Sequence, residues 1–208
     1  MAVQGFHEND FAVFSIPGLS ERMAAIVARV RPKLTEIGQE MEPFLTALTG
    51  EPMYFHVAKH MRRTVNPPDD TWVAWSNNKR GYKAYPHFEM GLFSTHLYIQ
   101  FAIVYESPHK AIMAAAMEKN PAAVLASVPK DFLWSLDSTM PMRQAHKLLR
   151  ERDIREMAAK LRLGKRFDLV CGANVLKGSE EALDGDKLRN KIETVCETLL
   201  PLYRLAFS

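Results

Sequence analysis

The stretch "PHFEMGLFSTHLYIQFAIVY", residues 86–105, decides the fold because its apolar side chains recur at every second position. Before a short turn, Phe88, Met90 and Leu92 alternate with polar or small residues. After the turn, the same alternation continues over residues 97–103. A period of two is typical of antiparallel strands that bury one face and leave the other polar. We therefore predict a pair of adjacent antiparallel strands.

Further strands flank this pair. Trp72–Ser76 has strand composition, and the period changes to two from Tyr54 onward. In the following "NNKRGY" segment we expect Gly81 to supply a turn position with positive φ. Toward the C-terminus, "DFLWSLD" and "RFDLVCGANV" are also predicted strands.

The N-terminal part of the chain shows a helical period. Over residues 19–48, apolar side chains recur every three or four positions, and Ser20 is the expected N-cap. Pro32 and Pro43 each remove a backbone donor, so we expect a kinked or segmented helix. Gly50 is expected to end it.

Helices return after the central strands. The predicted segments are a short pair split by Pro121, a longer helix over residues 143–163 closed by Gly164, and a last helix from about Asp186. This mixture predicts an α+β fold, a mainly antiparallel sheet with helices packed on one face. Its length suits a single domain over residues 1–208.

Composition narrows the class of protein. The chain of 208 residues is 47% hydrophobic and has a net charge of +3, which is globular and too weakly basic for a dedicated phosphate-backbone binder. Cys171 and Cys196 lie far apart among apolar residues, as reduced buried thiols of a cytoplasmic protein do. The acidic N-terminus does not resemble a signal peptide, and the longest apolar stretch is too short to cross a bilayer. We predict a cytoplasmic protein with no membrane partner.

The polar residues of the strand pair form the first candidate site. If the apolar residues share the core face, five polar residues share the opposite face: His87, Glu89, His96, Tyr98 and Gln100. Glu89 is then expected opposite or diagonal to His96 or Tyr98. Two imidazoles and a carboxylate make His87, Glu89 and His96 candidates for the catalytic groups of a hydrolase or metal-dependent enzyme. The same alternation is also typical of a solvated sheet face, and we prefer that interpretation.

His56 and His60 are a second pair of histidines in the chain. On a helix, four residues of separation would bring them together, but the segment around them is rich in aromatic and β-branched residues. On a strand they would lie about 13 Å apart, too far for one ion. We predict no metal site there.

A basic and aromatic cluster forms the second candidate site. Cations beside aromatic rings can hold phosphate and stack bases. The residues expected to contact phosphate, followed by those expected to stack, are Arg62, Arg63, Lys79, Arg80 and Lys83, with Tyr82 or Tyr85. We expect a binding protein for an anionic ligand, a nucleotide or an RNA segment, on the polar sheet face and its basic loops.

Other motifs are absent from the sequence. It contains no Gly-rich phosphate loop, nucleophile elbow, zinc-binding helix or CxxC pair, so any cofactor stays unknown. Ser135 and Asp137 are expected to serve the end of a strand and its turn. A scaffold that binds another protein through the exposed sheet face is a further alternative. The amino-acid sequence does not determine the oligomeric state.

The segments "MYFHVAKHMRRTVNPPDDTWVAWSNNKRGYK" and "PHFEMGLF" also carry a resemblance to a known family. Together with "IPGLSERM" before them and "PKDFLWSLD" and "LLPLYRL" after them, they resemble the YktB-like family of uncharacterised bacterial proteins. The resemblance covers nearly the whole chain in the same order. It implies a cytoplasmic α+β protein of one domain, and it transfers no catalytic residue because the family has none assigned.

Overall fold

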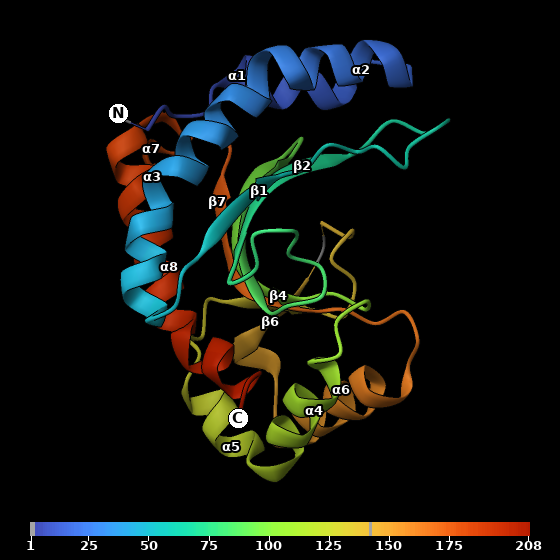
Figure 1. Cartoon of the computed structure of the whole chain (residues 1–208), viewed down its shortest axis with the longest axis vertical. Coiled ribbons are helices and arrows are strands. Elements are labelled where there is room, and N and C mark those ends of the chain that lie inside the picture. The colour runs from blue at the N-terminus through green and yellow to red at the C-terminus, as the bar shows by residue number, and fades with distance from the viewer. Residues whose placement is uncertain (1–2, 142) are drawn as a thin grey trace.

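The computed structural model describes residues 3–141 and 143–208, and its centre is a strongly curved antiparallel sheet (Figure 1). The seven strands lie in the order β1-β2-β3-β4-β7-β5-β6, and every neighbouring pair is antiparallel. The strands are β1 (Tyr54–Val57), β2 (Asp70–Ser76), β3 (His87–Phe93), β4 (His96–Ile103), β5 (Leu133–Ser135), β6 (Gln144–Ala145) and β7 (Leu169–Leu176). The predicted strand pair is therefore confirmed as β3 and β4 at the middle of the sheet.

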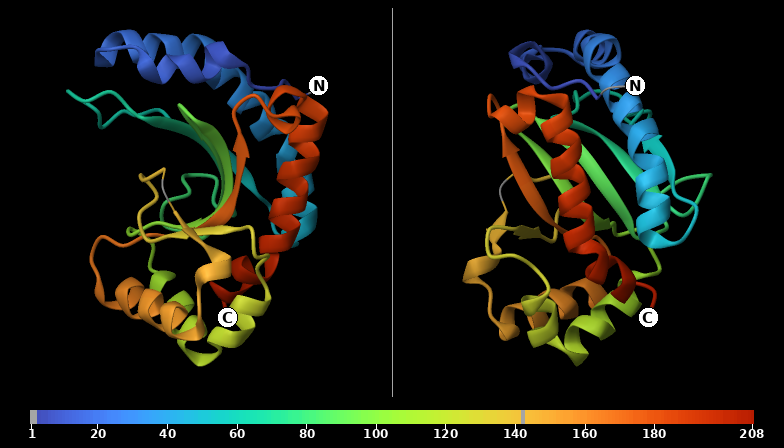
Figure 2. Two further views of the ribbon diagram at one scale, coloured as in Figure 1. Left: turned by 180° about the vertical axis from the view of Figure 1, so that it is seen from behind. Right: turned by 90° about the vertical axis from the view of Figure 1, so that its left-hand side faces the viewer.

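Helices cover the convex face and extend past the sheet at both ends. The two long helices, α3 (Arg31–Thr49) and α8 (Gly185–Leu205), lie across the convex face, and the others gather beyond its ends (Figure 2). The helices are α1 (Glu8–Phe11), α2 (Leu19–Ala25), α3 (Arg31–Thr49), α4 (Lys110–Lys119), α5 (Pro121–Ala126), α6 (Glu151–Leu163), α7 (Glu180–Leu183) and α8 (Gly185–Leu205), with 3₁₀ turns η1 (Ala12–Ser15) and η3 (His146–Leu148) and the π-helical segment η2 (Ile26–Val30). The predicted α+β class is confirmed.

The core lies between the convex face and the helices α3 and α8. Phe88 of β3 is opposite Phe101 of β4, and Tyr203 of α8 stacks on Phe88 with 5.2 Å between ring centroids. Trp75 of β2 donates its indole N–H to the carbonyl of Gly38 in α3, at 3.0 Å. A Cβ on Gly38 would lie 2.5 Å from the Phe55 ring, so only glycine lets α3 approach β1 this closely.

The N-terminal helical region is segmented, as predicted, because a π-helical turn separates α2 from α3. Gly50 ends α3 in the left-handed conformation at φ 78°, which is confirmed, and Pro43 lies inside α3 without ending it. The predicted cap at Ser20 is wrong, since Gly18 with φ 82° is the N-cap and Ser20 lies within the first turn. Glycine tolerates that positive φ without steric cost.

Two further predictions of local structure are wrong. Gly81 does not have positive φ, because the β2–β3 connection is a long loop whose turn is made by the Asn78 side chain accepting the Arg80 N–H at 2.8 Å. Residues 143–163 are not one helix, since β6 and a 3₁₀ turn precede α6. The N-terminus of α6 is fixed at Arg150, whose N–H donates to Asp153 at 2.8 Å.

Among residues 3–141 and 143–208, no helix is both long and apolar enough to cross a bilayer. Cys171 and Cys196 are buried and unpaired, as predicted. The single domain over residues 1–208 stays a prediction.

Candidate functional site on the concave face of the sheet

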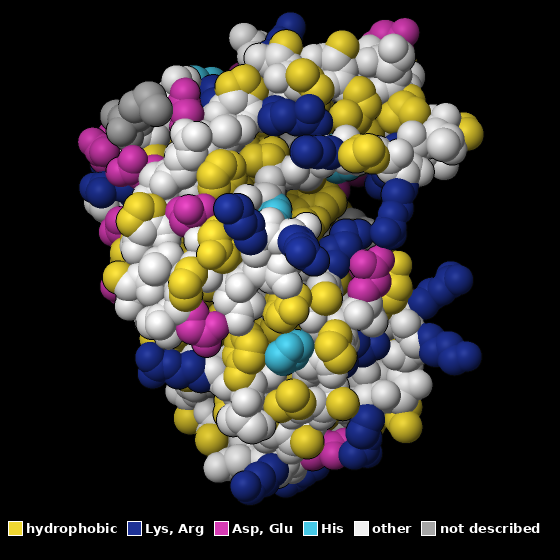
Figure 3. Space-filling view, in the orientation of Figure 1, with side chains coloured by type: hydrophobic (Ala, Val, Ile, Leu, Met, Phe, Trp, Pro, Cys, Tyr) yellow, Lys and Arg dark blue, Asp and Glu magenta, His cyan; other side chains and the backbone are white. Residues whose placement is uncertain are grey.

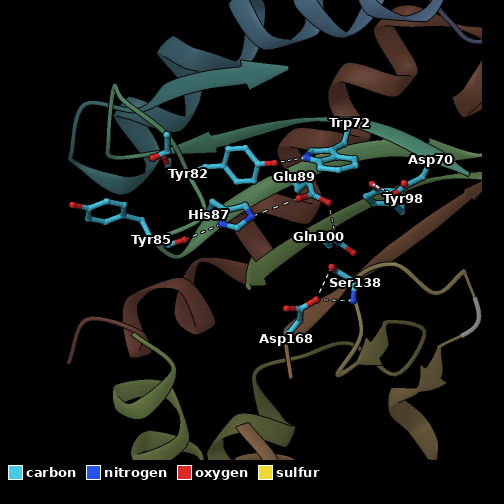
Figure 4. Close-up of polar contacts among 12 residues, drawn as sticks. Asp70, Trp72, Tyr82, Tyr85, His87, Glu89, Tyr98, Gln100, Ser138 and Asp168 are labelled. Carbon is cyan, nitrogen blue, oxygen red and sulfur yellow. Dashed lines mark hydrogen bonds and ion pairs between the residues drawn. The ribbon is translucent and has the colours of Figure 1, made fainter. Parts of the chain in front are cut away.

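The polar face of the strand pair is the concave face of the sheet, and it is buried. His87, Glu89, His96, Tyr98 and Gln100 share this face, as parity predicted, but each is at most 7% exposed. The expected solvated face is therefore wrong. The sheet curls around this surface, and the β2–β3 loop and the segment after β5 fold over it (Figures 1 and 4). Alternation fixes which face a residue occupies, but it does not reveal what covers that face.

A groove remains open over part of the concave face. It consists of three adjoining cavities of about 170, 410 and 650 Å³ that all include Tyr82 and Lys83 in their walls. The smallest cavity reaches Asp70 and Glu89 on the sheet. In the space-filling view the molecule is hollowed at this side, and Lys and Arg side chains gather along the edge (Figure 3). We call the three cavities together the groove, and the smallest one the inner cavity.

A chain of polar contacts crosses the concave face beneath the groove (Figure 4). Arg143 donates to the amide oxygen of Gln100, whose amide nitrogen donates to Glu89 Oε1 at 2.9 Å. The other oxygen of Glu89 lies 3.5 Å from His87 Nε2, and His87 Nδ1 lies 2.8 Å from the carbonyl oxygen of Tyr85. Glu89 is opposite Gln100 and diagonal to Tyr98, so its predicted neighbourhood with Tyr98 is confirmed.

The carbonyl oxygen of Tyr85 determines which ring nitrogen of His87 carries a hydrogen. A carbonyl oxygen only accepts, so His87 Nδ1 carries a hydrogen and donates it to Tyr85. His87 Nε2 lies 3.5 Å from Glu89 Oε2 and has no hydrogen-bond partner among the described residues. His87 is fully buried and does not line the inner cavity, so it can act there only through Glu89.

Asp70 is the second carboxylate of the floor. It begins β2 and accepts the Tyr98 hydroxyl at Oδ2, at 3.2 Å. Burial, with the Glu89 charge, raises the pKa of Asp70 to about 7, although the Tyr98 hydrogen bond opposes this rise. Asp70 and Trp72 are two residues apart on β2, so alternation could have placed Asp70 on the polar face. Nothing in the neighbouring sequence indicates that this carboxylate is buried.

An aromatic pair forms one wall of the inner cavity. Trp72 donates its indole N–H to the Tyr82 hydroxyl oxygen at 3.0 Å, which ties the β2–β3 loop down onto the sheet. Burial, with the Glu89 charge, raises the pKa of Tyr82, so its hydroxyl stays protonated. The predicted aromatic residue Tyr82 thus lies in the groove wall, while Tyr85 lines only the outermost cavity.

The opposite wall depends on residues that sequence reasoning missed. Asp168 Oδ1 accepts the N–H of Tyr105 at 2.7 Å, and its Oδ2 accepts the N–H and hydroxyl of Ser138 at 3.0 and 2.6 Å. This carboxylate joins the ends of β4 and β7 to the segment after β5. Arg143 extends from the same segment over the Tyr98 ring, with 5.2 Å to its centroid. These partners are 30 or more residues apart in sequence, so no local pattern indicates them.

The predicted catalytic trio is not brought together. His87 and Glu89 are neighbours, but His96 lies at the other end of β4, four residues from Gln100 and so about 13 Å along the strand. Its Nδ1 is paired with the Thr95 hydroxyl at 2.8 Å, and burial, with the Arg143 charge, lowers its pKa to about 4. Across the described residues, 3–141 and 143–208, no group of three or more His, Cys, Asp or Glu side chains could hold a metal ion.

The rim of the groove carries most of the predicted basic residues. Arg62 and Lys83 both approach one carboxylate oxygen, Glu106 Oε1, at 3.2 and 3.8 Å. Tyr105 donates its hydroxyl to the same oxygen at 3.1 Å. Arg63 lines the two smaller cavities, and Arg80 lines the largest. Lys79 is exposed and lines none of the three cavities.

His56 and His60, the second pair of histidines, occupy separate positions. His56 lies on β1 and pairs with the Asn78 carbonyl at 2.9 Å. His60 follows the strand in the left-handed conformation at φ 53°, and its ring pairs with the Thr71 hydroxyl at 3.1 Å. Burial, with the charges of Arg63 and Arg31, lowers the pKa of His60 to about 4, so it lines the groove as a neutral ring.

Fold and site together define an α+β protein with a buried polar sheet face and a groove rimmed by cations. Comparison with known proteins identifies the family. Residues 6–203 match the model described as "Domain of unknown function (DUF1054)", and the chain is 42% identical over 205 residues to UPF0637 proteins of Bacillus cytotoxicus, Bacillus cereus and Bacillus thuringiensis, covering 99% of each chain. The chain therefore belongs to the DUF1054, or UPF0637, family of bacterial proteins, with which the YktB-like resemblance agrees.

Proposed function

We propose that this protein binds a phosphate-bearing nucleotide in the groove, either free or as part of an RNA strand. In this proposal, Arg62, Arg63 and Lys83 hold the phosphate at the rim, and Trp72 and Tyr82 contact the base. Arg80 would contact a neighbouring phosphate in the outermost cavity. Cations combined with exposed aromatic faces are the groups that hold nucleotides and single strands.

The convergence of two cations on Glu106 Oε1 carries the proposal. Arg62 comes from the β1–β2 loop and Lys83 from the β2–β3 loop, yet both reach the same oxygen. The rim is thus already arranged around one anionic oxygen. Arg62 is 82% exposed, and exposed ion pairs contribute only about 0–1 kcal/mol. A phosphate with several acceptor oxygens can therefore replace Glu106 at little cost.

Binding titrations with variants of the rim test this function. Isothermal titration of wild-type protein with nucleoside monophosphates and with a short single-stranded oligoribonucleotide separates the free ligand from the strand. We expect Arg62→Ala and Lys83→Ala each to lower affinity about 10-fold, the loss of one charge-assisted hydrogen bond. Glu106→Gln removes the competing carboxylate, so affinity should rise about 2- to 5-fold.

Salt dependence and a distant lysine provide the controls. Affinity for the oligoribonucleotide should fall steeply as salt rises, because phosphate contacts release counterions. Lys119→Ala, at the exposed end of α4, should change nothing. Equal affinity in wild-type, Arg62→Ala and Lys83→Ala proteins, or no binding of either ligand, would reject the proposal.

A hydrolase acting on the bound ligand is the second candidate function, because Glu89 lines the inner cavity and an imidazole lies close behind it. The Nε2 of the buried His87 is 3.5 Å from Glu89 Oε2. A carboxyl group held in this way can act as a general acid or base toward a phosphoester attacked by water.

We propose the cytoplasm as the location, since two free buried thiols suit a reducing compartment.

Product formation distinguishes this candidate from simple binding. Incubation with nucleotides or oligoribonucleotides, followed by chromatography, should reveal a hydrolysed product for the wild-type protein. Glu89→Gln should abolish it without weakening binding. If ligands are recovered intact after saturation binding, the protein is a binding protein and the hydrolase is excluded for those ligands.

A further inference from the structure

We infer that the groove holds a single strand of nucleic acid longer than one nucleotide, with successive phosphates in its two larger cavities. The inference rests on the proposed nucleotide function and deepens it, because it states which part of a strand each cavity takes. Its basis is the distribution of charged and aromatic side chains over the three cavities.

The groove has room for more than one nucleotide. Its middle cavity has a volume of about 410 Å³ and its outermost cavity a volume of about 650 Å³. Each is within the range of about 300–1,000 Å³ for a pocket that binds one drug-sized ligand, such as a nucleotide. The two cavities adjoin, since Lys59, Tyr82 and Lys83 line both of them. A ligand that fills both cavities therefore contains more than one nucleotide unit.

Three cations without an ion-pair partner in the described part of the chain lie along these two cavities. Lys59 and Arg63 line the middle cavity, and Arg80 lines the outermost one. Among residues 3–141 and 143–208, no carboxylate forms an ion pair with any of the three side chains. A mononucleotide held at the rim leaves the cation of the outermost cavity without a phosphate. The successive phosphates of a strand supply an anion to each cavity, and such contacts release counterions.

The inner cavity has the opposite charge on its floor, which limits where phosphates can lie. Asp70 and Glu89 line that cavity, and Glu89 is buried. Arg63 and Lys83 also line it, but they belong to the loops that it shares with the middle cavity. A phosphate on the floor would lie beside two carboxylates, and like charges at a buried site repel strongly. The inner cavity is therefore left to an uncharged part of the strand, a base or a sugar.

Aromatic rings accompany the cations through all three cavities. Tyr85 lines the outermost cavity, Tyr82 lines all three, and Trp72 lines the middle and inner cavities. Figure 4 shows these three side chains in that order across the concave face. Aromatic rings in a basic groove stack on unpaired bases, which is how proteins hold single strands. Because every base has a face for stacking, we expect little preference for a particular base.

The length of the ligand tests the inference directly. Isothermal titration of the wild-type protein with 5′-phosphorylated oligouridylates should show about 10-fold tighter binding of the dinucleotide than of UMP. Affinity should level off once the strand extends past the groove. The dependence of log Kd on log salt concentration should become steeper by about 0.7 for each further phosphate contacted. Oligothymidylates of the same lengths compare DNA with RNA, and a GC-rich RNA duplex should bind at least about 10-fold more weakly than the hexauridylate, because its bases are not free to stack.

Arg80→Ala separates the outermost cavity from the rest of the groove. This variant should bind the hexauridylate about 10-fold more weakly, the loss of one charge-assisted hydrogen bond, with unchanged affinity for UMP. Lys79→Ala is the matched control, because Lys79 is the neighbouring exposed cation and lines none of the three cavities. Both side chains are exposed, so neither substitution should affect folding.

The outcomes separate this inference from the function on which it rests. Length-dependent binding of RNA or of DNA supports the strand, and the tighter of the two identifies the sugar. Equal affinity for UMP and the hexauridylate, or an Arg80→Ala variant that binds the hexauridylate as tightly as Lys79→Ala does, would overturn the strand while leaving nucleotide binding in place. Failure of UMP and of every strand to bind would overturn the proposed function itself.

Discussion

At the scale of single residues, Asp70 is the carboxyl group whose surroundings oppose its ionised form. It lines the inner cavity together with Glu89, and among the described residues the hydrogen-bond partner of its side chain is the Tyr98 hydroxyl. A residue retained at such a position lowers stability and points to a role in binding or chemistry. Asp70 was not among the residues that the sequence indicated.

The first prediction concerns the stability of Asp70→Asn. Because the folded-state pKa is raised to about 7 from 3.8, the stability associated with Asp70 is fully present below pH 3.8 and is lost as pH rises through about 7. The groups that face Asp70 are Glu89, Tyr98, Arg63 and Asp69. At pH 8 we expect the free energy of unfolding of Asp70→Asn to exceed that of wild type by about 1–3 kcal/mol. At pH 4 we expect a much smaller difference.

Urea unfolding at the two pH values measures this difference. A variant that is less stable than wild type at pH 8 would show that Asp70 supports the fold instead of opposing it. Asp131→Asn, at an exposed carboxylate before β5, serves as the control, with no gain in stability at pH 8.

At the scale of elements, glycine decides how closely β7 approaches β4. A Cβ on Gly172 would lie 2.0 Å from the carbonyl oxygen of Ile99 and 2.6 Å from the Cα of Gln100. Backbone atoms cannot move aside as a flexible side chain can. Gln100 is opposite Gly172 and donates to Glu89, so this contact also positions the hydrogen bond that Glu89 accepts.

We therefore predict that Gly172→Ala destabilises the protein by about 3 kcal/mol or more, because β4 and β7 must separate at the middle of the sheet. Gly81→Ala is the matched control. Nothing lies within 4 Å of its added Cβ, and its φ is not positive, so a change within about 0.5 kcal/mol is expected. Thermal or urea unfolding of both variants measures this, and equal stability would refute the close approach.

The β1–β2 loop, which carries Arg62 and Arg63, is held by a side chain from the N-terminal helices. Arg22 of α2 is buried and donates to the Pro68 carbonyl at 2.9 Å and to Asp69 at 3.1 Å. Its Nε also donates to the Ile16 carbonyl at 2.9 Å. The position of the rim cations therefore depends on Arg22, which is 46 residues away in sequence from its partner Pro68 in the loop.

Substitution of Arg22 should make the β1–β2 loop more mobile. Arg22→Met leaves the Pro68 carbonyl without its donor, which costs about 1–3 kcal/mol. We expect faster amide hydrogen exchange over residues 58–69, measured by mass spectrometry, with exchange in α6 unchanged. Unchanged exchange in the loop would mean that other contacts hold it.

At the scale of the whole molecule, the groove exists because distant segments converge on one curved sheet. The floor of the inner cavity comes from β2 and β3, and its walls come from the β1–β2 and β2–β3 loops, the residues after β4 and the segment after β5. The two long helices cover the opposite face (Figure 2). No part of the chain forms the groove alone, so its formation is tied to completion of the fold.

We therefore predict one cooperative unfolding transition, in agreement with a single domain over residues 1–208. Far-ultraviolet circular dichroism and tryptophan fluorescence should give coincident transitions in urea. The three tryptophans are well placed for this test, because Trp72 and Trp75 lie on β2 and Trp134 lies on β5 near the other edge of the sheet. Two separated transitions would indicate two units.

Several features of the candidate site followed from sequence, and several did not. The pairing of β3 with β4 and the shared face of His87, Glu89, Tyr98 and Gln100 follow from alternation alone. The exclusion of His96 from that cluster does not, because alternation gives the face but not the distance along the strand. The predicted helix over 143–163 missed β6, since a strand of two residues is fixed by its partner and not by its own composition.

By itself, the sequence determined the α+β class, the parity of the central strands and the basic character of the β1–β2 and β2–β3 loops, because these depend on neighbouring residues. Only the tertiary structure decided that the polar face is buried and that Arg62 and Lys83 meet at Glu106. It also decided that Asp70 shares the floor with Glu89. The physical reason is the curvature of the sheet and the loops that close over it, which set distances between residues that have no sequence relation to one another.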